Sequence, residues 1–98
     1  MQNVEVSIEE AVNSVVQKGK EITVEVEEND FFFIESIIGA YVQVEGETII
    51  IGKVDEESMF ELRVNMTGIS CIEKKEESLE VTLFLKENKK IKIMQNKC

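Results

Sequence analysis

The clearest periodic pattern in the chain is a strict alternation of polar and apolar residues over positions 21–27. Ile22, Val24 and Val26 occupy one side of this stretch, and glutamates and one threonine occupy the other. Successive side chains of a β-strand point to opposite faces of the sheet. The alternation therefore predicts a half-buried strand over 21–27 that exposes its carboxylates to solvent.

Residues 8–18 show a helical spacing of apolar positions instead. Ser7 and Glu10 match a capping box, in which each side chain accepts a backbone N–H of the other residue. Lys18 suits the negative end of a helix dipole, and Gly19 suits the left-handed conformation that often follows a helix. The pattern predicts a helix over 8–18, with its apolar face formed by Ile8, Ala11, Val12, Val15 and Val16.

The segment from Phe31 to Ile38 fits either a helix or a buried strand. Its three isoleucines lie on one helical face, Asn29 or Asp30 is a suitable N-cap, and Gly39 follows the segment. The β-branched and aromatic residues of the segment also suit a strand. We favour a short helix here.

From residue 40 onward the pattern predicts strands joined by short polar turns, over 41–45, 47–54, 59–65, 69–73, 79–85 and 90–94. Short strands with short connections are typical of antiparallel sheets. We therefore expect a single α+β domain over residues 1–98. Its N-terminal helix would pack on a mostly antiparallel, meander-like sheet or a small SH3/Sm-like barrel.

Part of the strand pattern resembles that of Sm-like and SH3-like barrels. The matching positions are Ile38-Gly39, Val42, Val44, the run from Ile51 to Asp55, Met59, Leu62 and the run from Ile69 to Ile72. The resemblance implies a curled barrel. It implies no functional residue, because the chain lacks the histidine and the polar and basic loop residues with which bacterial Sm-like proteins bind RNA.

Charge is unevenly distributed along the chain. Of 98 residues, 20 are Asp or Glu and 11 are Lys or Arg, and the net charge is −9. Residues 1–61 contain fifteen acids and three lysines, whereas residues 62–98 contain five acids and eight basic residues. This asymmetry predicts a folded molecule with an acidic side and a mildly basic side.

The chain lacks the residues on which several classes of protein function usually depend. There is no histidine, which excludes Ser-His and Cys-His nucleophile chemistry and imidazole-based metal sites. No glycine-rich phosphate loop, signal peptide or spanning apolar run is present. Cys71 and Cys98 suggest free thiols in a reducing cytoplasm rather than a disulfide framework. We expect a cytoplasmic, non-enzymatic protein without a cofactor, in preference to a carboxylate hydrolase.

The acids of the N-terminal half predict recognition of a basic protein surface, with the phenylalanine cluster as an apolar anchor. Such a protein could inhibit a nucleic-acid-binding protein by imitating nucleic acid, as some phage or mobile-element proteins do. A solvated strand face, an ordinary polar turn and a buried aromatic cluster are the simpler explanations, and a Ca²⁺ or Mg²⁺ site in the acidic loop is less favoured. The predicted partner-binding residues are Glu25, Glu27, Glu28, Asp30, Phe31, Phe32, Asp55, Glu56 and Glu57.

The C-terminal segment is rich in lysine. Direct nucleic-acid binding would use these lysines to neutralise phosphates, but no aromatic stacking platform accompanies them. We favour an edge strand, where lysine blocks unwanted pairing, and consider ion pairs with the acidic half as a second explanation. Two alternative functions remain, a self-assembling structural barrel such as a homodimer, and an Sm-like RNA-binding module. The lysines are Lys86, Lys89, Lys90, Lys92 and Lys97.

Overall fold

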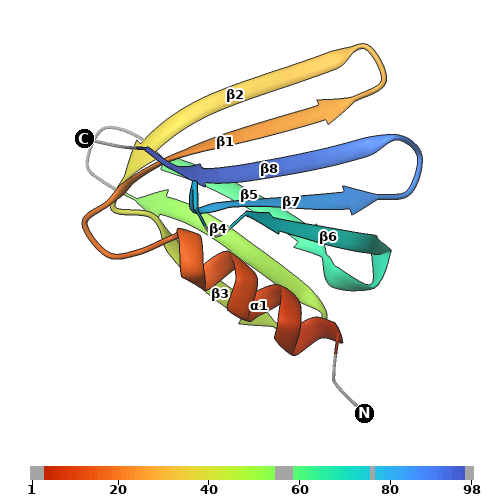
Figure 1. Cartoon of the computed structure of the whole chain (residues 1–98), viewed down its shortest axis with the longest axis horizontal. Helices are drawn as coiled ribbons and strands as arrows, with labels where there is room; N and C mark the ends of the chain where they lie inside the picture. Colours follow the sequence, from red (N-terminus) through yellow and green to blue (C-terminus); the bar gives the residue numbers. More distant parts are fainter. Residues whose placement is uncertain (1–3, 55–58, 76, 97–98) are drawn as a thin grey trace.

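The computed structural model describes residues 4–54, 59–75 and 77–96, and within these ranges it contains one α-helix, eight strands and a short 3-10 helix (Figure 1). The helix α1 spans Val4–Val15. The strands are β1 (Glu21–Glu28), β2 (Phe31–Ile38), β3 (Tyr41–Glu45), β4 (Thr48–Val54), β5 (Met59–Asn65), β6 (Ile69–Lys75), β7 (Glu80–Leu85) and β8 (Lys89–Gln95), and the 3-10 helix η1 (Met66–Gly68) joins β5 to β6.

The strands form two antiparallel sheets. One has five strands in the order β2-β1-β8-β7-β6, and the other has three in the order β3-β4-β5. In Figure 1 the five strands run side by side from β2 at the top, and the three-stranded sheet crosses them obliquely. The predicted α+β class with an antiparallel sheet is confirmed. The sheets do not close into a barrel, because they remain separate layers of five and three strands.

The helix closes one side of the space between the two sheets. It contacts β7 and β8 of the larger sheet, β3 of the smaller sheet, and η1. The predicted apolar face is confirmed, since Ile8, Val12 and Val15 are fully buried. The helix begins and ends earlier than the predicted 8–18, and Ser7 lies within its first turn, so the predicted N-terminal cap at Ser7 is wrong. No helix in the described ranges is long and apolar enough to cross a membrane.

The core lies between the two sheets and under the helix. The inward residues of β1, such as Ile22 and Val24, are fully buried, as the alternation of positions 21–27 predicts. Ile49 and Ile51 on β4 face them from the smaller sheet and belong to the same buried cluster. The remaining buried members from the strands are Val26, Ile37, Val64, Ile69, Val81, Leu83, Ile91 and Ile93.

The prediction of a short helix over Phe31–Ile38 is wrong. This segment is strand β2, which pairs with β1 along its whole length, from Glu28↔Phe31 to Glu21↔Ile38. Asn29, with a φ of 51°, helps to form the tight turn between the two strands, and asparagine tolerates this left-handed conformation. Cross-strand pairing after such a turn outweighs the weak helical spacing of the isoleucines, because tertiary context overrides local propensity.

Candidate binding surface on the β1–β2 hairpin

Six of the predicted partner-binding residues lie on the hairpin of β1 and β2. Asn29 and Asp30 form its turn, the first pair after the turn is Glu28 with Phe31, and the second brings Glu27 opposite Phe32. Residues directly opposite each other in an antiparallel pair share one face of the sheet. The hairpin therefore places the carboxylates of Glu25 and Glu27 beside the ring of Phe32 on its solvent face, whereas Glu28 and Phe31 share the other face. This outer face is the side of the five-stranded sheet turned away from the core.

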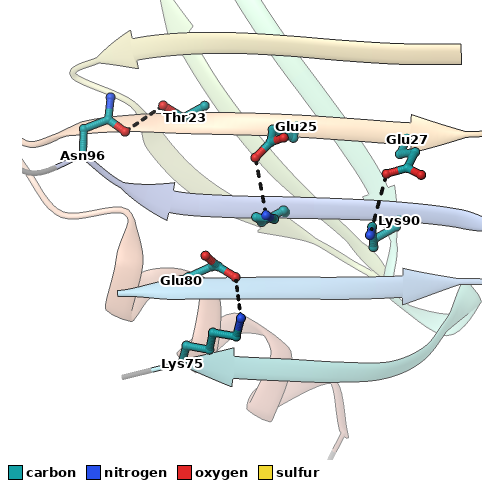
Figure 2. Close-up of polar contacts among 8 residues, drawn as sticks. Thr23, Glu25, Glu27, Lys75, Glu80, Lys90 and Asn96 are labelled. Atoms are coloured by element: carbon teal, nitrogen blue, oxygen red, sulfur yellow. Dashed lines mark hydrogen bonds and ion pairs between the residues drawn. The ribbon is translucent and has the colours of Figure 1, made fainter. Parts of the chain in front are cut away.

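The carboxylates in the middle of β1 face lysines of β8. Figure 2 shows Glu25 and Glu27 reaching toward this neighbouring strand. The Glu25 Oε2 atom lies 3.7 Å from Lys92 Nζ, and the Glu27 Oε2 atom lies 3.7 Å from Lys90 Nζ. Both pairs are direct cross-strand neighbours. The acidic row of β1 is thus matched by a basic row on the adjacent strand.

A third ion pair lies at the end of the hairpin, where Glu28 Oε2 is 3.5 Å from Lys89 Nζ. These contacts confirm the second explanation for the lysines, pairing with the acidic half. The edge-strand explanation is wrong, because β8 lies between β1 and β7 in the interior of the sheet. The order of strands places the lysines of β8 beside β1, where they pair with glutamates of that strand.

The three ion pairs are not equally enclosed. The side chain of Glu25 is 19% exposed, whereas that of Glu27 is 53% exposed. Ion pairs between exposed side chains contribute only about 0.2–1 kcal/mol, because water and salt screen them. A cation from a partner can therefore replace Lys90 at Glu27 more easily than it can replace Lys92 at Glu25.

Further polar contacts join the outer face across its strands (Figure 2). The hydroxyl of the buried Thr23 donates to Asn96 Oδ1 at 2.7 Å, which ties the segment after β8 to β1. At the opposite side of the sheet, Lys75 Nζ lies 3.7 Å from Glu80 Oε2. Much of this face is therefore occupied by contacts within the chain.

Two acids of the hairpin are open to a partner. Asp30 in the turn and Glu35 in β2 are exposed, and neither has an ion pair or side-chain hydrogen bond with another residue that the structure describes. Three glutamates of β1, by contrast, each form an ion pair with a lysine of β8. Free negative charge on the hairpin is consequently concentrated at the turn and along β2.

Strand β2 exposes an unusual amount of apolar surface. Phe31 is 59% exposed and Phe32 is 57% exposed, and Ile34 and Ile38 are also more than half exposed. Phe32, Ile34 and Ile38 alternate along β2 and so share its outer face. Sequence reasoning missed the two isoleucines, because the helical interpretation placed both on a buried face. Of the three isoleucines in this segment, Ile37 alone is buried.

One phenylalanine of the cluster anchors the hairpin to the smaller sheet. The ring of Phe33 stacks on that of Phe60 in β5, with centroids 6.2 Å apart and planes at 11°. Phe33 is thus partly buried against the core, and the simpler explanation of a buried aromatic cluster holds for this ring alone among the three. Phe31, on the same face as Phe33 but nearer the turn, and Phe32, on the opposite face, remain exposed.

The free edge of β2 adds a second property to this surface. The strand has β1 as its neighbour on one side and ends the five-stranded sheet on the other. Alternate residues of an antiparallel strand direct their N–H and C=O groups away from the first neighbour. β2 thus combines an exposed apolar row with an unpaired row of backbone groups. Its one charged residue is Glu35.

The predicted residues Asp55, Glu56 and Glu57 lie outside the described residues. The positions that flank them, Val54 and Met59, pair across β4 and β5 and are both strongly exposed. Within the described ranges, no three His, Cys, Asp or Glu side chains are grouped closely enough to hold a metal ion.

The single cysteine in the described ranges, Cys71, is an exposed free thiol on β6, as predicted.

The smaller sheet has a polar outer surface around Tyr41. This side chain lies over Gly52, the residue opposite it on β4. Nearby, Arg63 Nε donates to Glu61 Oε1 at 2.6 Å, and this hydrogen bond raises the pKa of Arg63 above its usual value. Tyr41 and Arg63 are both exposed strand residues, and the side chains of the ion pair are 58% exposed for Arg63 and 38% exposed for Glu61.

Comparisons of this chain with protein-family models, with curated proteins and with solved structures found no match. The hairpin of β1 and β2 is therefore the basis for a functional inference.

Proposed function

We propose that this protein is a non-enzymatic binding module that recognises a basic protein surface through the end of its β1–β2 hairpin. The observation that carries the proposal is the exposure of two phenylalanine rings beside exposed carboxylates. We call this set the hairpin tip, and it consists of Glu27, Glu28, Asp30, Phe31 and Phe32.

Aromatic side chains on a surface favour protein binding. Burying a phenylalanine side chain stabilises by about 1.5–3 kcal/mol relative to leaving it in water. Phe31 and Phe32 do not gain most of that stabilisation in the isolated molecule, since each is more than half exposed to water. Interfaces are enriched in aromatic residues for the same reason. A partner that covers both rings recovers the free energy that the fold leaves unused.

The charges of the hairpin tip select the kind of partner. Asp30 has no cation beside it among the described residues, and Glu27 and Glu28 are paired with partly exposed lysines. Lysine or arginine residues of a partner would pair with Asp30 and compete for the two glutamates. The net charge of −9 would steer basic proteins toward this molecule and repel acidic ones.

Nucleic-acid imitation, which extends the basic-partner prediction, and RNA binding, one of its two alternatives, are less well supported by the geometry. Imitation of a nucleic-acid backbone needs a free row of negative charge, and Glu25 and Glu27 each face a lysine. RNA binding through the lysine hairpin needs free cations, and Lys89, Lys90 and Lys92 each face a glutamate. We therefore favour a basic protein partner over both.

The test is affinity capture from lysate of the cells that make the protein, at low and at high ionic strength. We expect captured basic proteins that are retained at low salt and released at high salt, because screening weakens exposed charge pairs. The variant Asp30→Lys combined with Phe32→Ser should lose them. Glu10→Lys is the matched control, because Glu10 is exposed on α1 and the charge change is the same.

Capture of the same proteins by the Asp30→Lys, Phe32→Ser variant and by the Glu10→Lys control would overturn the proposal. Circular dichroism of each variant establishes that it is folded. Reversal of Glu25 is unsuitable for this test, because a second lysine facing Lys92 would weaken the sheet itself.

A further inference from the structure

The free edge of β2 is long enough to accept another strand. All eight residues of β2 pair with β1 on one side, from Phe31 to Ile38, and the other side ends the sheet. Unpaired edges of this kind are templates for strand addition, in which backbone hydrogen bonds supply affinity and alternate side chains supply specificity. Natural edge strands are usually protected by several charges or by proline, and β2 has only Glu35.

The two faces of β2 would impose a pattern on an added strand. On the outer face its side chains would lie beside Phe32, Ile34 and Ile38, which are exposed and apolar. On the other face they would lie beside Phe33 and Ile37 at the margin of the core, with the exposed Glu35 between them. The matching strand is apolar at alternate positions and has a cation opposite Glu35.

A second copy of this chain is a poor match for the same edge. When two identical strands pair antiparallel about a two-fold axis, one residue lies opposite itself. The register that matches the apolar residues best places Phe32 opposite Ile38 and Phe33 opposite Ile37, and it puts Glu35 opposite Glu35. Like charges directly opposite each other are destabilising. The net charge of −9 on each copy adds to this repulsion.

Neighbouring registers do not relieve the problem. A shift of the two-fold axis by one residue in either direction sets Glu35 against Phe33 or against Ile37, where its carboxylate has no partner. Glu35 therefore disfavours self-pairing in each case and favours a strand that supplies a cation.

We propose, on the basis of the function inferred above, that the basic partner binds as an extended strand added to β2. The partner segment alternates apolar residues with polar ones and carries a lysine or arginine opposite Glu35. The added strand extends the five-stranded sheet at its free edge. The hairpin tip lies at one end of the added strand, where Asp30 and Phe31 contact the flanking residues of the partner.

The test uses a capped synthetic peptide as long as β2, with alternating valine and threonine and a central lysine, and a twin peptide with a central glutamate. Binding is followed by backbone amide chemical shifts of the protein. We expect the lysine peptide to shift the amides of β2 and to bind roughly threefold or more tightly than its twin. In the Glu35→Lys variant the preference should reverse, and in Glu10→Lys it should not change.

Backbone methylation separates strand addition from a loose ionic contact. Only alternate N–H groups of an added strand face β2, so one alternating set of N-methyl groups should abolish binding and the complementary set should not. Equal binding of the two methylated peptides, or an unchanged lysine preference in Glu35→Lys, would overturn strand addition.

The two proposals fail in different ways. Proteins captured in an Asp30-dependent manner, together with a negative peptide test, would retain the basic-partner function and remove strand addition. Peptide binding along β2 without any Asp30-dependent capture would support strand addition and overturn the function assigned to the hairpin tip.

Discussion

Tyr41 can lie against the smaller sheet because the residue opposite it has no side chain. An ideal Cβ atom at position 52 would be 2.7 Å from Tyr41 Oη, 2.8 Å from Tyr41 Cζ and 3.0 Å from the Phe60 carbonyl oxygen. Tyrosine therefore covers Gly52, which is a common way of stabilising a glycine inside a sheet. The sequence indicates a glycine at a turn or strand position here, but it does not reveal the ring that lies over it.

Replacing this glycine should destabilise the fold. We expect Gly52→Ala to lower the free energy of unfolding by about 1–3 kcal/mol, because the ring of Tyr41 must move and the Phe60 carbonyl is fixed in the backbone. Urea denaturation measures the change. Gly68→Ala is the control, since a Cβ atom there meets nothing within 4 Å. Equal stability of the two variants would contradict the described packing.

A single carboxylate should limit self-association of this chain. Removing the charge in Glu35→Gln eliminates the like-charge contact in the best self-pairing register of β2. We expect association between copies to strengthen by roughly two- to fivefold, as measured by sedimentation equilibrium at low salt. Glu10→Gln on the exposed face of α1 has the same net charge and should behave like the wild type. If both variants associate equally, Glu35 has no protective role.

Individual strands were predictable where only one of their faces is buried. The alternation over 21–27 correctly identifies Ile22, Val24 and Val26 as the core-facing side chains of β1, because a two-residue period determines this directly, although Thr23 on the opposite face is also buried. The order of strands was not predictable, since β1 and β8 are far apart in the sequence and no local pattern links them. The sequence therefore predicted ion pairs between the C-terminal lysines and the acidic N-terminal half, but it did not predict which lysine pairs with Glu25 or Glu27.

The segment Phe31–Ile38 shows why a strand can be mistaken for a helix. Its outer face is apolar as well as its inner one, so the alternation that distinguishes β1 is absent from β2. An apolar run of this length is ambiguous from periodicity alone. The candidate surface was accordingly predicted in part, through Phe31, Phe32 and Asp30, while Ile34, Ile38 and the free edge required the structure.

Strand pairing predicts different strengths for the two ion pairs on β1. In double-mutant cycles with alanine, we expect about 0.5–1 kcal/mol of coupling between Glu25 and Lys92, which are the less exposed pair. Glu27 and Lys90 should show a smaller value, because both are more exposed. Urea denaturation of each single and double variant supplies the data. A larger coupling for Glu27 and Lys90 would show that exposure does not govern these contacts.

The whole molecule contains more negative charge than its internal pairs can balance. The lysines of β8 compensate β1, yet the net charge remains −9. Excess charge of one sign destabilises a compact state through self-repulsion, and salt screens that repulsion. The local ion pairs are weakened by the same screening, but acids outnumber bases so strongly that the repulsive contribution should dominate.

We therefore expect the melting temperature to rise by several degrees between low and high sodium chloride. A change of 1 kcal/mol shifts the melting temperature of a domain of this size by about 4–8 °C. Calorimetry at fixed pH measures the shift. A Glu10→Gln, Glu47→Gln variant carries less negative charge and should respond less to salt. A fall in melting temperature with added salt would show that the internal ion pairs outweigh the net repulsion.

The position of β1 in the larger sheet has a consequence for synthesis of the chain. Its neighbour β2 follows after a tight turn, but its other neighbour, β8, is the last strand of the sheet to leave the ribosome. Until β8 is available, β1 has a strand neighbour on one side only, so both strands of the β1–β2 hairpin have an unpaired edge. A chain interrupted before Lys89 would leave β1–β2 and β6–β7 as two hairpins without the strand that joins them, so β8 has to be synthesised before the five-stranded sheet can form.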